Sequence, residues 1–134
     1  MAVNTQQKVW FFYGLMISAI LLYVLVGFLS RSSVVAASEL SLRFMTRAFM
    51  VVAGIETIIV LVLLPRFAGK MPYLTYGIVR WAMAESVAVE GLVLFYVGAG
   101  QGLFLVFLGW SLALMLLCAP TEADREKHEL LQRS

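Results

Sequence analysis

Three acidic side chains stand inside strongly apolar stretches of the sequence: Glu56, Glu85 and Glu90. An ionised carboxylate at the centre of a membrane helix costs on the order of 3 kcal/mol on helix-insertion scales. We therefore expect each of them to face other helices, to pair, or to be neutral. Desolvation favours the protonated form of a carboxyl group, and such a group can load and release a proton. These residues predict a proton or cation site.

Depth along the expected helices favours Glu56 and Glu85 as the central pair. With a rise of ~1.5 Å per residue, Glu56 lies roughly 18 Å into its helix, and Glu85 roughly 13 Å into the next helix from the opposite face. Glu90 lies about one to two turns farther along. Because Glu85 and Glu90 are five residues apart, or ~140° around a helix, they do not share a face. Arg47 and Arg80 are the possible ion-pair partners.

Two other interpretations of these carboxylates remain open. In a structural one, buried carboxyls hydrogen-bond between helices, and Ser86, Thr57 or Arg47 satisfies them, with ~0.6–2 kcal/mol gained per bond. In the other, the carboxylates form a site for a polar ligand or a lipid headgroup. Arg80, near a membrane boundary, is expected either to reach water or to reach a carboxylate of a neighbouring helix.

The sequence excludes several kinds of chemistry. Cys118 is the only cysteine and His128 the only histidine, so the chain supplies no internal disulfide, thiolate metal site, haem histidine pair or zinc site. It has no nucleophile–base pair and no soluble domain to hold a substrate. It also lacks the basic and aromatic pattern of nucleic-acid binding. We expect a non-enzymatic protein without a metal or other cofactor.

Long apolar helices must position the carboxylates. The 134 residues are 62% hydrophobic and 13% charged, whereas soluble domains are about 25% charged. A bilayer core of ~30 Å needs ~20 helical residues. We therefore predict an all-α fold, an integral membrane four-helix bundle over residues 1–119. Its expected spans are Val9–Leu29, Phe44–Leu64, Tyr76–Val97 and Leu103–Cys118.

Proline, glycine and capping residues set the expected limits of these helices. Pro65 is expected to end the second span and Pro120 the fourth. The glycine-rich residues 98–102 predict a tight turn that makes the last two spans an antiparallel hairpin. Residues 30–43 are open to three interpretations: a loop, an interfacial helix, or an extension of the second helix that begins at a cap formed by Ser38.

An even number of spans places both termini on one side of the membrane. Lysine and arginine are more frequent on cytoplasmic loops, so we expect both termini in the cytoplasm and the chain in a cytoplasmic or inner membrane of bacterial type. The expected cytoplasmic side holds Lys8, Arg66, Lys70, Arg80, Arg125, Lys127 and Arg133, and the other side holds Arg31, Arg43 and Arg47.

The charged tail, residues 120–134, predicts a short helix capped by Thr121. Arg125 and Glu129, and Glu129 and Arg133, are four residues apart and can pair along it. One interpretation is a solvated helix that frays. The other is a docking segment for a neighbouring subunit, with Leu130 and Leu131 as its apolar edge.

Small residues recur at helical spacing on the last two spans, where they allow another helix to approach closely. We expect this packing inside the chain or between copies. The residues are Ala84, Ala88 and Gly91 on the third span, and Gly102, Gly109 and Ala113 on the fourth.

Residues 82–93, AMAESVAVEGLV, resemble the carboxylate-bearing helix of rotary ATPase proteolipid (c-type) subunits. That family often shows Ala-x-x-Glu-Ala/Ser, a few apolar residues, an aromatic residue, and then Gly-Leu-Val. The resemblance implies that Glu85 is the ion-carrying carboxylate. This chain differs from the family in having Glu90 at the aromatic position and only Gly54 on the second helix, where the family is glycine-rich.

Two functions follow as expectations. The first is a non-enzymatic accessory or structural subunit of a larger membrane assembly, whose partners are the lipid bilayer and other membrane subunits or further copies of the chain. The second is a proteolipid-like protein that handles protons or cations with Glu56 and Glu85.

Overall fold

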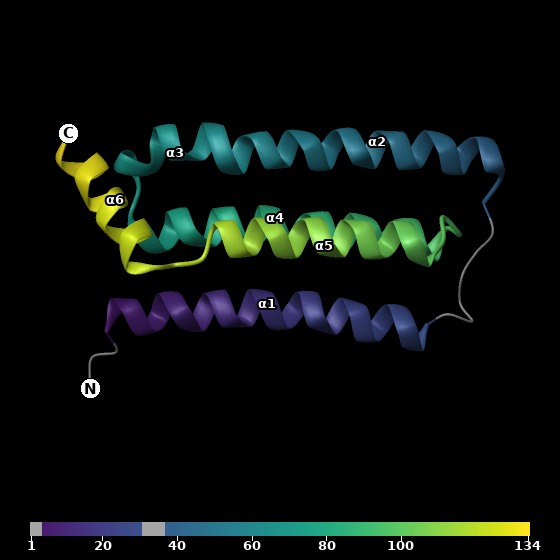
Figure 1. Ribbon diagram of the computed structural model, residues 1–134, viewed down its shortest axis with the longest axis horizontal. Helices are drawn as coiled ribbons and strands as arrows, with labels where there is room; N and C mark the ends of the chain where they lie inside the picture. Colours follow the sequence, from purple (N-terminus) through teal and green to yellow (C-terminus); the bar gives the residue numbers. More distant parts are fainter. Residues whose placement is uncertain (1–3, 31–36) are drawn as a thin grey trace.

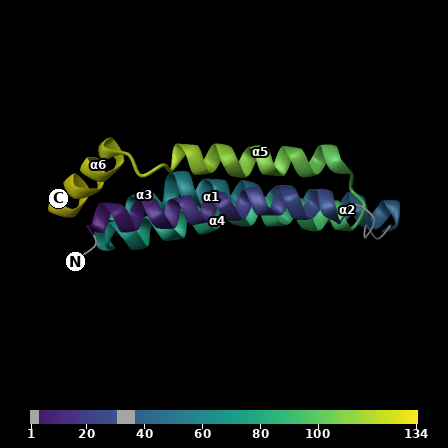
Figure 2. The same cartoon turned by 90° about the horizontal axis from the view of Figure 1, so that it is seen from below.

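The computed structural model describes residues 4–30 and 37–134, and every element within these ranges is a helix. The long helices α1 (Thr5–Leu29), α2 (Glu39–Ile58), α4 (Tyr73–Tyr96) and α5 (Gln101–Leu117) run alongside one another (Figure 1). A π-helical turn, η2 (Ile59–Leu63), continues α2 into the short helix α3 (Leu64–Phe67) and the 3-10 turn η3 (Ala68–Lys70). The last helix, α6 (Glu122–Arg133), is bent by 64° from α5 and lies across one end of the molecule (Figure 2).

Helix α4 is the centre of the packing. It contacts α5, α1 and α2, and it buries more side chains than any other described helix. By contrast, α1 and α2 expose many large apolar side chains, such as Leu21, Leu25, Ile55 and Ile58. Exposed apolar surface on this scale is typical of a protein surrounded by lipid.

Two helical stretches are long and apolar enough to cross a membrane, α1 and the continuous stretch Glu39–Lys70, and the bent pair α5 and α6 would make a third. These stretches support the prediction that the chain is a membrane protein. Helix α4 is also long enough, but it carries Arg80, Glu85 and Glu90. It can cross a bilayer only if other helices cover these side chains.

The second helix does not end at Leu64, as expected, but continues through Pro65 to Lys70. A proline inside an α-helix removes one hydrogen bond and collides with the carbonyl four residues earlier. Here the π-helical turn Ile59–Leu63 comes directly before it, and Pro65 falls in the first turn of α3. The wider turn changes the helical phase, so the helix accommodates the proline.

The other expected limits agree more closely with the structure. Ser38 caps α2, which begins at Glu39, so the extension is the correct interpretation for residues 39–43. Arg31, expected in the first loop, lies outside the described residues. Gly98 and Gly100 both have φ of 95°, a conformation that favours glycine. They form the tight turn between α4 and α5.

The two groups of small residues behave differently. Ala84 and Ala88 are fully buried, and a Cβ on Gly91 would lie 2.5 Å from the Cβ of Phe107. The stripe on α4 therefore packs against α5. Gly102 and Gly109 are exposed and have open space around the Cβ position, so the expected packing inside the chain is wrong for them.

Gly91→Ala should destabilise the protein by about 1–3 kcal/mol, because the new methyl group collides with Phe107 and the helices must separate. The matched control is Gly109→Ala. It should stabilise the protein by about 0.5–1 kcal/mol, because alanine is the better helix former and meets no neighbour. Thermal unfolding in mild detergent measures both. Equal effects of the two variants would contradict this account of the α4–α5 contact.

Candidate functional site

Glu85 faces α1. It is half-buried, and the hydroxyl of Tyr23 donates a hydrogen bond to its Oε1. Glu56, the other residue of the expected central pair, accepts a hydrogen bond from Ser86, the residue after Glu85. Adjacent residues point ~100° apart on a helix, so Glu85 and Ser86 are directed to different neighbouring helices.

A second cluster, Glu56, Ser86 and Glu90, lies between α2 and α4. The Ser86 hydroxyl lies 2.6 Å from Glu56 Oε1. Ser86 and Glu90 are four residues apart and share one face of α4, and Ser86 places this face toward Glu56 of α2. Glu56 Oε2 and Glu90 Oε2 are buried without a hydrogen-bond partner. We call these three residues the carboxylate cluster.

The carboxylate cluster is suited to holding a proton. Two negative charges close together in an apolar environment repel each other strongly, so one of the pair is readily neutralised. A protonated carboxyl is neutral, so it costs less to bury without a partner than a carboxylate does. Of the other groups expected to satisfy Glu56, Thr57 donates to the Ala53 carbonyl and accepts a bond from Trp110 instead.

The two arginines expected to pair with the intramembrane carboxylates do not do so. Arg47 is exposed and has no ion-pair partner among the described residues. Arg80 is buried and pairs with Asp124 of α6, at 2.7 Å between Nη2 and Oδ2. Arg80 therefore reaches a carboxylate of a neighbouring helix, as one of its two expectations had it, but this carboxylate belongs to the tail.

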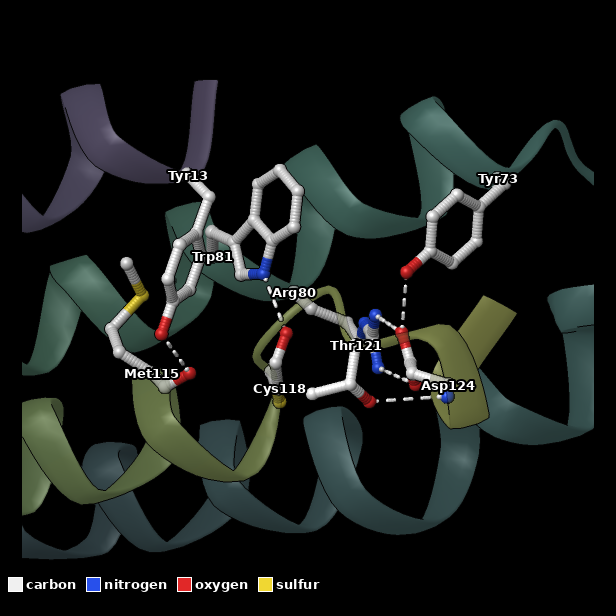
Figure 3. Close-up of polar contacts among 8 residues, drawn as sticks. All are labelled: Tyr13, Tyr73, Arg80, Trp81, Met115, Cys118, Thr121 and Asp124. Atoms are coloured by element: carbon white, nitrogen blue, oxygen red, sulfur yellow. Dashed lines mark hydrogen bonds and ion pairs between the residues drawn. The ribbon is translucent and has the colours of Figure 1, made fainter. Parts of the chain in front are cut away.

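Figure 3 shows how Asp124 connects α6 to α4. Its carboxylate accepts two hydrogen bonds from Arg80 and one, of 2.8 Å, from the Tyr73 hydroxyl. Tyr73 precedes the expected span. Burial and then the bond to Asp124 raise its pKa, so the phenol keeps the proton that it donates.

The ring of His128 lies between two tyrosines of α4. Its centroid is 5.4 Å from that of Tyr76, which it stacks upon, and 5.3 Å from that of Tyr73. His128 is buried, and both of its ring nitrogens lack a hydrogen-bond partner. Farther along α6, a Cβ on Gly69 would lie 2.5 Å from the carbonyl oxygen of Leu131, so the two backbones are close.

These contacts argue against one of the two interpretations of the tail, the free solvated helix, and docking to a neighbouring subunit stays a prediction. Thr121 caps the helix, and Arg125 pairs with Glu129, as expected. The tail is not a free solvated helix, because Asp124 and His128 attach it to the same chain. Leu130 and Leu131, the expected apolar edge, remain exposed.

Two side chains outside the predicted site hold the end of α5. Tyr13 donates a hydrogen bond of 2.9 Å to the carbonyl of Met115, and Trp81 donates one of 2.8 Å to the carbonyl of Cys118 (Figure 3). The last carbonyls of a helix have no partner within it, so these bonds fix where α5 stops. Cys118 itself is buried.

Some of these residues could have been found from their types. Tyr23 places a hydroxyl in the middle of an apolar span, where it needs a partner, and the carboxylates are the obvious acceptors. Asp124 gave no comparable signal, because an acidic residue in the first turn of a helix is favourable by itself.

Comparison of the chain with protein-family models, with curated proteins and with solved structures found no match. The resemblance of residues 82–93 to proteolipid subunits therefore remains a local one.

Asp124→Ala should destabilise the protein by about 3–5 kcal/mol, because it leaves the buried Arg80 charge without its partner. Helix α6 should then detach, which hydrogen exchange and limited proteolysis of the tail would detect. The control Glu129→Ala breaks the exposed pair with Arg125 and should change stability by at most about 0.5 kcal/mol. A tail that stays protected in Asp124→Ala would show that this ion pair does not hold it.

Proposed function

We propose that the chain is a non-enzymatic integral membrane protein with four spans, both termini on the cytoplasmic side of a bacterial-type inner membrane, and a proton-binding carboxylate cluster. The start of α1 and the whole of α6 lie at the same end of the molecule (Figure 1), which supports an even number of spans. That end also carries most of the lysines and arginines, as expected for a cytoplasmic side.

The observation that carries the proton-binding role is the pair of buried, unpartnered oxygens, Glu56 Oε2 and Glu90 Oε2. A polar atom buried without a partner is destabilising by about 1–3 kcal/mol, and a protein that serves only as a scaffold gains nothing from it. One proton on either carboxyl removes one of the two buried charges. We therefore expect the cluster to bind a proton.

Ser86 supports this function by its hydrogen bond to Glu56. A single donor on Oε1 leaves Oε2 free to accept a proton, whereas a pairing with arginine would hold the carboxylate in its charged form. Glu85 is the alternative proton carrier, since Tyr23 donates to it in a similar way. In a small chain, proton binding of this kind fits a subunit that works with other membrane subunits.

Infrared difference spectroscopy of the protein in lipid tests the proposal, because it detects the carbonyl stretch of a protonated carboxyl. The band expected from the wild type should disappear in the double variant Glu56→Gln with Glu90→Gln, since glutamine keeps the size of the side chain without the acid. Glu85→Gln is the matched control and should keep the band. A band that persists in the double variant and is lost in Glu85→Gln would assign the proton to Glu85 instead.

A second candidate is the accessory scaffold, favoured by the outer face of α5. Gly102 and Gly109 leave open space there beside exposed Leu105 and Val106, where a helix of another subunit can approach. The stripe at Ala88 and Gly91 is not available for such a partner, since it is buried against α5.

If α5 binds another membrane subunit, Gly109→Leu should greatly reduce the recovery of proteins that copurify in mild detergent, because the larger side chain keeps the partner helix away. The double carboxylate variant should copurify as the wild type does. Unchanged recovery with Gly109→Leu would remove the support that this face gives to the scaffold.

A further inference from the structure

A cavity of about 170 Å³ opens where α6 crosses the ends of the long helices. It is much larger than the ~30 Å³ that one water occupies in the liquid. Helix α4 lines it with Tyr76 and Arg80, and α6 lines it with Asp124, Lys127 and His128. We call it the α6 cavity. It is separate from the carboxylate cluster, whose residues do not line it.

Two residues that line the α6 cavity have buried nitrogens without a hydrogen-bond partner. Arg80 uses both terminal nitrogens on Asp124, and its Nε is buried without a partner. His128 is 3% exposed, and neither ring nitrogen has a partner. Buried polar atoms normally have hydrogen-bond partners, so unpartnered nitrogens on two residues of one cavity indicate that a ligand supplies an acceptor.

The charges around the cavity favour an anion. Asp124 is the acidic residue that lines it, and Arg80 and Tyr73 already bind its carboxylate. Lys127 is exposed and lies outside the ion pairs of the described residues, so the lining carries one positive charge beyond the Arg80–Asp124 pair. Phosphate groups accept several hydrogen bonds from arginine, lysine and histidine at once.

The apolar part of the lining favours a lipid as the source of the phosphate. Leu61 and Leu117 belong to the lining, and both are exposed. They extend from the cavity onto surface that would face lipid, where acyl chains can cover them. Basic residues at this depth are the usual contacts of anionic headgroups.

We infer that the α6 cavity binds a phosphate-bearing anion, and that this is the headgroup of an anionic phospholipid whose acyl chains lie along Leu61 and Leu117. The site is formed jointly by α4 and α6. Bound lipid therefore stabilises the docked position of the tail helix as well as the protein.

The experiment compares thermal unfolding of the full chain in mild detergent after adding dioleoyl phosphatidylglycerol, dioleoylglycerol or inorganic phosphate. Phosphatidylglycerol at about ten times its Kd should raise the Tm by about 5 °C, and dioleoylglycerol, which lacks the phosphate, should not. An equal rise with inorganic phosphate would support the site and identify free phosphate as its ligand. No rise with either phosphate compound would overturn the proposal.

Two variants make the test specific. His128→Phe keeps a ring between the tyrosines but removes both nitrogens, so it should fold at least as stably without lipid and lose the rise in Tm. Lys127→Gln should weaken binding of phosphatidylglycerol about fivefold. Arg133→Gln removes one exposed positive charge of the same helix away from the cavity, and it should bind as the wild type does. A full response in His128→Phe would show that the lipid binds elsewhere.

Discussion

Helix α4 can lie among apolar helices only because each of its charged side chains is covered by a different neighbour. Arg80 meets Asp124 of α6, Glu85 meets Tyr23 of α1, and Glu90 lies on the face of α4 from which Ser86 meets Glu56 of α2. An uncovered charge in lipid is costly, so these contacts determine which way α4 is rotated. The small residues Ala84, Ala88 and Gly91 then pack against α5, the neighbour that receives no charge.

The fold could be predicted wherever the signal is local. Ser38 and Thr121 cap their helices, and Gly98 and Gly100 form the turn, because each acts through the backbone beside it. The prediction that Pro65 ends the second helix was wrong because this signal is not local. Its effect depends on whether the preceding turn can widen, and the π-helical turn at Ile59–Leu63 is not visible in an apolar sequence.

The sequence predicted which residue types form the candidate site but not how they are arranged. Glu56 lies in a stretch that is apolar enough to cross a membrane, and Glu85 and Glu90 lie on the long helix α4, but depth along a helix could not tell which neighbour each side chain faces. Glu85 and Ser86 are adjacent in the sequence, yet the side chain of Glu85 faces α1 and that of Ser86 faces α2. The partner of Arg80 was missed because it comes from a tail whose composition resembles that of any solvated helix.

The polar groups on α4 and on the helices around it are of two kinds: those with hydrogen-bond partners and those with buried atoms that have none. Glu85 accepts a hydrogen bond from Tyr23, and Asp124 accepts hydrogen bonds from Tyr73 and Arg80. These bonds stabilise the packing of α1 and α6 against α4. Glu56, Glu90 and His128 have buried atoms without partners, and these atoms lower the stability of the unliganded protein. These unpartnered atoms do not help to stabilise a fold in which the charged groups must be covered. They are the atoms at which a proton or a phosphate group adds a missing bond, and function is therefore expected there.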